Sequence, residues 1–240
     1  MAAPSSTLIF GSTGLTGSHI LSTFLTTRPT IPVITISRRE PSTTAANLTT
    51  ILEADTTKWA PSIATVTPKP DTIISAVGTT RVQAGGIANQ WKIDHDLNIE
   101  LAKAAKEAGA KTFVFVSSGG TRGLLSGFVP YSKMKNGVED AIRDLGFEQA
   151  IVLRPGALLG DRDKHRTGDG VMQSAFRSLD FIGIKDKLSV EGEVVGRAAA
   201  AALKIAADGK APNKYWTIEQ PDIIKLGREE WKDEPAPEAK

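Results

Sequence analysis

Short runs of β-branched and aromatic residues alternate with longer amphipathic segments along most of this chain. The short runs predict buried strands over residues 7–10, 31–37, 48–52, 71–76, 111–117, 149–153 and 215–219. The longer segments predict helices over residues 14–27, 87–108, 131–145 and 194–207. Strands that alternate with helices form βα units on a parallel sheet. The pattern therefore predicts an α/β fold with a doubly wound parallel sheet.

Turn-forming residues end these elements, and nothing in the pattern indicates a second domain. Gly109 and Gly146 follow the second and third predicted helices, as helix-terminating glycines do. An α/β chain of 240 residues commonly folds as one domain. We therefore expect a single domain over residues 1–240, with a small C-terminal substrate region inserted at 157–189 and a frayed tail at 232–240.

Composition excludes several classes of function. Hydrophobic residues make up 40% of the chain and charged residues 23%, which is typical of globular rather than disordered proteins. The formal net charge is +2 and no basic run alternates with aromatic residues, so we expect no nucleic-acid partner. The chain has no cysteine, which excludes disulfides and thiolate catalysis. His19, His95 and His165 lack a metal-binding spacing, so we expect no metal site.

The hydrophobic runs are too short for a membrane anchor. None approaches the ~20 apolar residues that a membrane-spanning helix needs. The six residues before the first predicted strand are too few for a secretory signal. We expect any membrane contact to be peripheral.

A glycine-rich turn joins the first predicted strand to the first predicted helix. We call it the phosphate turn, and it consists of Gly11, Ser12, Thr13, Gly14, Leu15, Thr16 and Gly17. Glycine permits the tight bend, lets the backbone approach a pyrophosphate, and leads into a helix N-terminus with free N–H groups. The turn therefore predicts a Rossmann-type site for a dinucleotide. The alternative is an ordinary turn between a strand and a helix.

The end of the second predicted strand indicates which dinucleotide binds. An acidic residue there accepts the ribose hydroxyls of NAD, whereas cations hold the 2′-phosphate of NADP. Here Ser37, Arg38 and Arg39 end the strand, and guanidinium groups match phosphate geometry, so NADP(H) is the expected cofactor. The alternative is that one or both arginines are solvated surface charges. Asp55, near the end of the third strand, could contact adenine or could equally be a turn residue.

Tyr131 and Lys135 lie four residues apart on a predicted helix and therefore share one face of it. A nearby ammonium favours the phenolate, so Tyr131 could donate or accept a proton. Ser118 follows the fifth predicted strand, and its hydroxyl could contact the same substrate oxygen. The pair alone is a weak signal, but all three residues belong at the carboxyl edge of one sheet, where ligands bind.

Together these residues resemble the short-chain dehydrogenase/reductase superfamily, in its extended or atypical branch. Further segments are similar to the fungal family of proteins found in the mitochondrial proteome, relatives of the vertebrate Tat-interacting oxidoreductase. These segments are residues 77–81, 93–96, 115–120, 131–135 and 153–162. The resemblance covers about residues 7–231.

The resemblance implies binding of NADP(H), with residues after the fourth strand along the cofactor and two further residues beside the nicotinamide. The first set is Ala76, Val77, Gly78 and Thr79, and the second is Pro155 and Gly156. It also implies that Tyr131 is the catalytic acid, that Lys135 holds the nicotinamide ribose, and that Ser118 orients a carbonyl. Ser117 competes with Ser118 for that role. Asp94 stands where many members of the superfamily carry Asn, so an Asn-dependent proton relay is in doubt.

These residues predict an NADPH-dependent oxidoreductase that reduces a carbonyl of a small molecule, with Tyr131 as proton donor. The same site could instead catalyse epimerisation or dehydration, or the protein could be an NADPH-binding redox sensor with little turnover. Fold alone does not choose among these activities. The resemblance further implies peripheral association with the cytosolic face of the mitochondrial outer membrane, and a monomer or homodimer.

Overall fold

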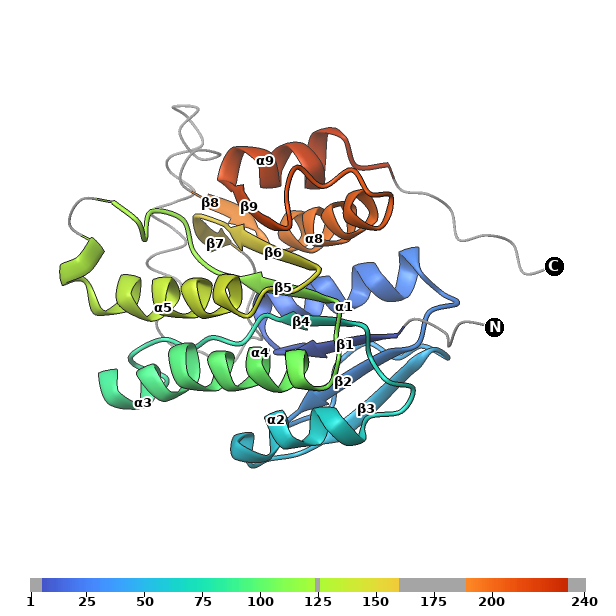
Figure 1. Cartoon of the computed structure of the whole chain (residues 1–240), viewed down its shortest axis with the longest axis horizontal. Coiled ribbons are helices and arrows are strands. Elements are labelled where there is room, and N and C mark those ends of the chain that lie inside the picture. Colours follow the sequence, from blue (N-terminus) through green and yellow to red (C-terminus); the bar gives the residue numbers. More distant parts are fainter. Residues whose placement is uncertain (1–5, 124–125, 160–188, 233–240) are drawn as a thin grey trace.

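A seven-stranded parallel sheet forms the centre of the molecule (Figure 1). The computed structural model describes residues 6–123, 126–159 and 189–232. The strand order is β3-β2-β1-β4-β5-β6-β9, and every neighbouring pair is parallel. The bounds are β1 Thr7–Phe10, β2 Val33–Ser37, β3 Leu48–Leu52, β4 Thr72–Ser75, β5 Thr112–Val116, β6 Gln149–Arg154 and β9 Tyr215–Glu219. The strand order reverses between β1 and β4, which confirms the predicted doubly wound Rossmann-type fold.

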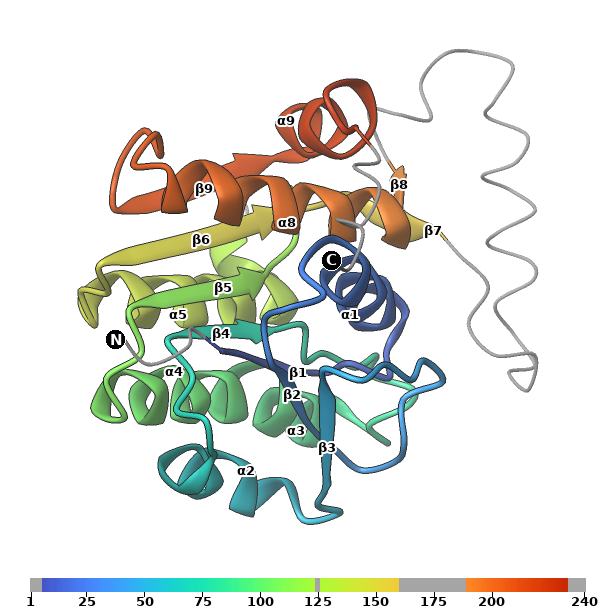
Figure 2. The ribbon, with the colours of Figure 1, turned by 90° about the vertical axis from the view of Figure 1, so that its right-hand side faces the viewer.

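Helices cover both faces of this sheet (Figure 1 and Figure 2). α1 and α8 lie on one face, and α2, α4 and α5 lie on the other. The helix bounds are α1 Leu15–Thr27, α2 Trp59–Ser62, α3 Ile87–Trp91, α4 Leu97–Glu107, α5 Pro130–Asp144, α8 Gly192–Ala207 and α9 Gln220–Ile224. The predicted strands and helices agree with these bounds to within one or two residues, the usual scatter at element ends.

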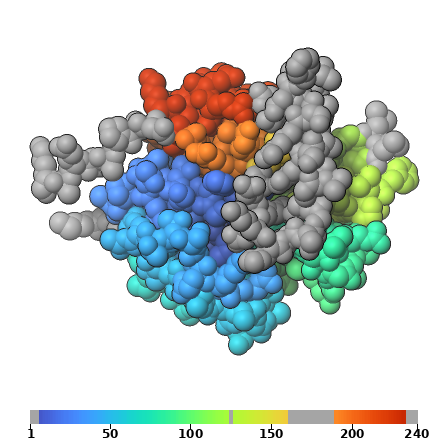
Figure 3. Space-filling model, turned by 180° about the vertical axis from the view of Figure 1, so that it is seen from behind, coloured from blue at the N-terminus to red at the C-terminus, as the bar shows by residue number. Residues whose placement is uncertain are grey.

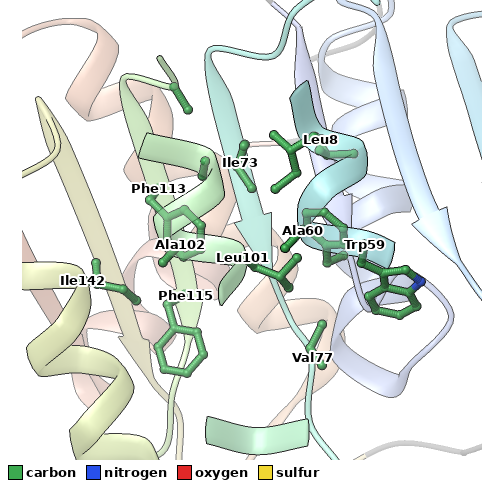
Figure 4. Close-up of a cluster of buried hydrophobic side chains, with 14 of the residues drawn as sticks. Leu8, Trp59, Ala60, Ile73, Val77, Leu101, Ala102, Phe113, Phe115 and Ile142 are labelled. Atoms are coloured by element: carbon green, nitrogen blue, oxygen red, sulfur yellow. The ribbon is translucent and has the colours of Figure 1, made fainter. Parts of the chain in front are cut away.

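Two hydrophobic cores form because side chains alternate across each strand. In β5, Phe113 and Phe115 face α4 and α5, whereas Val114 faces the side of α1 and α8. Figure 4 shows the first core, in which strand side chains meet those of α2, α4 and α5. Both faces of the central strands are buried, so β1, β5 and β6 are mainly apolar runs rather than alternating ones, whereas the edge strand β3 is partly exposed. This is why the strands were visible in the sequence.

Glycines allow α1 and α8 to pack closely. A Cβ at Gly196 would lie 2.9 Å from the backbone carbonyl of His19, and one at Gly192 would lie 2.8 Å from its ring. The two glycines are four residues apart and therefore face α1 from one side of α8. In Figure 3 the orange segment of α8 lies against the blue segment that contains α1, although they come from opposite ends of the chain.

The structure differs from the sequence prediction in several places. The short helices α2 and α9 and the π-helical turn at Lys225–Glu229 were not predicted. The predicted helix over residues 87–108 contains a π-helical turn at Lys92–Asp96, between α3 and α4. The region after β6 is not wholly irregular, because β7 Ala157–Leu159 pairs in parallel with β8 Ser189–Glu191. The rest of the predicted substrate region, residues 160–188, and all but the first residue of the predicted tail lie outside the described residues.

Candidate functional site

Four neighbouring strands end together at the carboxyl edge of the sheet and bring the candidate residues to one place. β1 runs into the phosphate turn, and β4, β5 and β6 are followed by Gly78, Ser118 and Pro155. These strands are adjacent in the order β1-β4-β5-β6. The backbone N–H of Gly119 donates to the carbonyl oxygen of Pro155 at 2.7 Å, which joins the ends of β5 and β6. This edge is where parallel sheets of this type bind ligands.

The phosphate turn is closed by glycine. Gly11 has a φ of 77°, and a Cβ there would lie 2.6 Å from the backbone carbonyl of Ala76. A Cβ at Gly17 would overlap the carbonyl oxygen of Gly11 and lie 2.6 Å from its carbon. The N–H of Gly14 donates to the same oxygen at 2.9 Å. Glycine is therefore required at positions 11 and 17, because a Cβ at either would meet neighbouring backbone, and the predicted approach of this turn to a pyrophosphate stays a prediction.

The groups around this turn fit a pyrophosphate. The N-cap of α1, Gly14, provides no side-chain hydrogen bond, and the first turn of α1 carries no acidic residue. The N–H groups at that end therefore face no competing acceptor from their own cap. The Ser12 and Thr16 hydroxyls are buried without a hydrogen-bond partner among the described residues. Buried polar groups left without partners in the protein are expected to be satisfied by something else, such as a ligand.

Gly17→Ala is expected to lower the free energy of unfolding by about 1–3 kcal/mol, because the new methyl group would meet rigid backbone. Urea denaturation measures the change. Gly14→Ala is the matched control, since its Cβ would lie 3.3 Å from the Gly11 oxygen at an exposed position, and its effect should be smaller. Equal destabilisation by the two variants would contradict the close approach at Gly17.

The residues after β2 lie beside the phosphate turn. A terminal nitrogen of Arg39 donates to the carbonyl oxygen of Thr13 at 3.1 Å. The Ser37 hydroxyl donates to the Arg39 carbonyl oxygen at 2.8 Å, which shapes the backbone there. Arg38 is exposed. The structure thus brings these residues to the edge beside the turn, and a contact with a 2′-phosphate stays a prediction.

Asp55 caps a short 3-10 turn, Thr56–Lys58. Its carboxylate accepts from the Thr57 hydroxyl at 2.6 Å and from the Thr57 N–H at 3.0 Å. These two hydrogen bonds lower the pKa of Asp55. The turn role is therefore present in the structure, and a contact with adenine stays a prediction.

Lys135 is buried, with 4% of its surface exposed, and its ammonium group lies at the end of β5. Its Nζ donates to the Val116 carbonyl oxygen at 3.3 Å, lies 4.8 Å from the centre of the Phe115 ring, and is 4.0 Å from Asp94 Oδ1. A Cβ at Gly78 would lie 3.9 Å from this Nζ. A side chain at position 78 would therefore contact the ammonium and, with its Cβ 3.3 Å from Asp94 Oδ1, would press more closely on that carboxylate.

Asn98 was missed by the sequence interpretation, and it shapes this part of the site. Its amide nitrogen donates to the carbonyl oxygens of Ile93 at 3.0 Å and of Val77 and Asp94 at 3.3 Å. Its amide oxygen accepts from the Ser75 hydroxyl at 2.6 Å. Asn98 thus joins the end of β4 to the π-helical turn. The available signal was a polar residue on the buried face of an amphipathic helix.

The structure separates the two serines after β5. The Ser117 hydroxyl is buried and donates to Glu139 Oε1 at 2.6 Å, so it is committed to a different cluster. Ser118 is partly exposed at the site edge, and its carbonyl oxygen accepts from Thr121 at 3.2 Å. Tyr131 lies in the first turn of α5 with 36% of its surface exposed. This geometry favours Ser118 over Ser117 as the partner of Tyr131, and the catalytic roles stay predictions.

A buried ionic cluster lies next to the carboxyl end of β6, and the sequence analysis did not predict it. Glu139 on α5 is fully buried and accepts from Arg154 at 2.6 and 3.1 Å and from Arg122 at 3.1 Å. Arg154 also pairs with Glu219 of β9 at 2.7 Å. The hydrogen bonds to Glu139 raise the pKa of Arg154. The cluster therefore joins α5, β6 and β9.

Gln220, which the sequence analysis also missed, binds the segment after β6. Its side-chain oxygen accepts from the Gly156 N–H at 2.6 Å, and its side-chain nitrogen donates to the Ser189 carbonyl oxygen at 2.7 Å. This places Pro155 and Gly156 between β5 and β8 at the same edge. Their predicted contact with the nicotinamide remains a prediction.

A known family matches most of the chain. Residues 7–180 match the family described as the NAD dependent epimerase/dehydratase family. The chain belongs to this family. Membership makes it a dinucleotide-binding protein of the oxidoreductase and epimerase type, and it explains why the phosphate turn opens the fold.

Fungal relatives are similar over nearly their full length. "Protein fmp-52, mitochondrial" of Neurospora crassa is 54% identical over 239 residues, which cover 97% of this chain and 99% of that protein. "Protein fmp52-2, mitochondrial" of Aspergillus oryzae is 55% identical over 226 residues, which cover 93% and 97%. These matches confirm the predicted resemblance to the fungal family. The relation to the Tat-interacting oxidoreductase stays a prediction.

Solved structures agree with the fold. The structure described as "MoeE5 in complex with UDP-glucose and NAD" has a TM-score of 0.66 and 16% identity, with 94% of this chain and 81% of that chain covered. At this identity the likeness shows the fold alone. Within residues 6–123, 126–159 and 189–232, no helix is long and apolar enough to cross a membrane, and no cluster of His, Asp and Glu could hold a metal ion.

Proposed function

We propose that the chain is an NADP(H)-dependent oxidoreductase that reduces a carbonyl of a small molecule. The observation that supports this most directly is the buried ammonium of Lys135, which lies one helical turn from Tyr131 and 3.9 Å from the position of a Cβ at Gly78. A positioned proton donor and a cation near the cofactor both favour carbonyl reduction. Lys135 and Tyr131 could supply these two groups from one face of α5.

Each part of the site has a distinct task in this proposal. The backbone of the phosphate turn and the N-terminus of α1 bind the pyrophosphate, and Arg38 and Arg39 bind the 2′-phosphate. When bound, NADPH supplies a hydride to the carbonyl carbon. Ser118 orients the carbonyl oxygen, and Tyr131 donates its proton to that oxygen, so that the product is an alcohol. Lys135 holds the ribose and stabilises the tyrosinate left behind.

Replacing Arg38 and Arg39 with Ala together is expected to raise the Kd for NADPH about 30- to 900-fold, since each of the two lost charge-assisted bonds costs roughly 1–2 kcal/mol. The Kd for NADH should change by less than about threefold, because NADH carries no 2′-phosphate. Titration of wild type and variant with both dinucleotides measures this. NADH therefore serves as the matched control ligand.

Three outcomes of that titration have different meanings. An equal loss of affinity for NADPH and NADH would contradict the proposed role of the arginines in binding the 2′-phosphate. No change for either would leave them as surface charges. Failure of the wild type to bind any dinucleotide would overturn the proposed function itself.

Epimerisation or dehydration is the second candidate, because the family carries these activities in its description and a structural neighbour was solved with UDP-glucose. Consumption of NADPH separates the two, since a reductase oxidises one NADPH for each product and an epimerase regenerates its cofactor. Tight binding without turnover on any carbonyl or sugar nucleotide would instead favour the redox sensor.

We also propose that the protein associates peripherally with the cytosolic face of the mitochondrial outer membrane. The word "mitochondrial" in the names of the fungal relatives supports the organelle. Alkaline carbonate extraction and protease treatment of intact mitochondria test the placement. Release by carbonate and digestion without detergent are the expected results, and protection from the protease would contradict an outer face.

A further inference from the structure

Asp94 is a buried carboxylate that bridges two segments of the site. It is 1% exposed and lies in the π-helical turn Lys92–Asp96. Its Oδ2 accepts from the Thr79 N–H at 2.9 Å, and its Oδ1 lies 4.0 Å from Lys135 Nζ. One side chain thus contacts both the segment after β4 and the ammonium on α5.

The groups around Asp94 identify the charge that it faces. Burial raises its pKa, and Lys135 and the Thr79 N–H act in the opposite direction. Its neighbour His95 pairs with Asp96 instead, with Nδ1 and Oδ1 2.7 Å apart. Among the described residues, Lys135 is the cation within ion-pair distance of Asp94. Keeping a carboxylate buried is costly unless it is paired and hydrogen-bonded, and Asp94 has both an ion pair with Lys135 and a hydrogen bond from Thr79.

The backbone presents Asp94 in this position. A π-helical turn shifts the register of a helix by one residue and often occurs at functional sites. Asn98 donates to the carbonyl oxygens of Ile93 and Asp94, which stabilises the turn. The side chain of Asp94 then meets the space beside Gly78, where a Cβ would lie 3.3 Å from Oδ1. The carboxylate and the ammonium therefore both lie beside Gly78.

We propose that Asp94 is a positioning residue for the nicotinamide half of the cofactor, which it serves by holding Lys135 and the Thr79 backbone in fixed relation. The inference rests on the proposed function. An Asn at this position would keep the hydrogen bond to Thr79 but would lose the ion pair with Lys135.

The test compares two ligands that differ in the nicotinamide half. NADPH fills the whole site, whereas 2′,5′-ADP reaches only the phosphate turn and the residues after β2. Asp94→Ala is expected to raise the Kd for NADPH about tenfold and to change the Kd for 2′,5′-ADP by less than about twofold. Asp94→Asn should raise the Kd for NADPH about threefold, because its amide oxygen still accepts from Thr79.

Asp96→Asn is the matched control. Asp96 lies on the same π-helical turn, but its carboxylate is half-exposed and pairs with His95. Both affinities should remain at the wild-type values in this variant. If Asp94→Ala does not fold, the Kd values of Asp94→Asn and Asp96→Asn for NADPH and 2′,5′-ADP still test the inference.

Several outcomes would overturn the inference. Equal weakening of both ligands by the Asp94 variants would show a merely structural role, and unchanged NADPH affinity would show no role. If the wild type binds 2′,5′-ADP and NADPH equally well, the nicotinamide half has no site to position. If the wild type binds neither ligand, the proposed function itself fails, which is a different result from the other three.

Discussion

Tyr131→Phe is expected to lower kcat/KM for carbonyl reduction about 10²- to 10⁴-fold, the usual contribution of general acid catalysis. The variant loses one phenolic oxygen on the first turn of α5 and keeps the ring. Lys135 and the phosphate turn are unchanged, so the Kd for NADPH should stay within about twofold of wild type. Steady-state kinetics on a carbonyl found by screening, together with NADPH titration, measure the two quantities.

The second tyrosine of the chain provides the control. Tyr215 begins β9, and its hydroxyl donates to the Glu139 carbonyl oxygen at 3.1 Å. Burial raises the pKa of Tyr215 to about 12, so its phenol stays protonated under assay conditions. Tyr215→Phe should retain turnover. Full activity in Tyr131→Phe would show that another group donates the proton.

Glu139→Ala is expected to lower the free energy of unfolding by about 2–4 kcal/mol, because Arg154 loses its buried partner and keeps its pair with half-exposed Glu219. Glu139 is fully buried, and Arg154 beside it has 15% of its side chain exposed. The Ser117 hydroxyl loses its acceptor as well. Urea denaturation followed by circular dichroism measures the change.

The adjacent carboxylate is the matched control for this experiment. Asp140 is 42% exposed and pairs with Arg122 at 2.7 Å and with Arg143. Solvent screens such pairs, so Asp140→Ala should cost about 1 kcal/mol or less. Similar losses in the two variants would mean that burial does not distinguish the two carboxylates. The loss in the free energy of unfolding for Glu139→Gln should lie between those of the two Ala variants, since Gln keeps an acceptor oxygen and the shape of the side chain but not its charge.

Local patterns in the sequence were enough to predict the fold and the position of the phosphate turn. The strands buried on both faces are mainly apolar, as in β5 after Thr112, and this signal depends only on consecutive residues. The close approach at Gly17 is local, because it is to Gly11 within the same turn, whereas that at Gly11 is to Ala76 after β4 and depends on the assembled sheet. The i,i+4 spacing is likewise sufficient to place Tyr131 and Lys135 on one helix face.

Contacts between distant segments could not be obtained in this way. Three contacts of the site join elements far apart in the chain. They are the ion pair of Asp94 with Lys135, the hydrogen bond from Ser117 to Glu139, and the hydrogen bond from Gly156 to Gln220. The π-helical turn that presents Asp94 was also invisible, because its one-residue shift leaves the apolar periodicity nearly intact. Periodicity and glycine spacing reflect interactions within a few residues, which the sequence specifies directly. Partners across elements depend on strand register, helix packing and the direction of each side chain, and these are set when the whole sheet and its helices assemble.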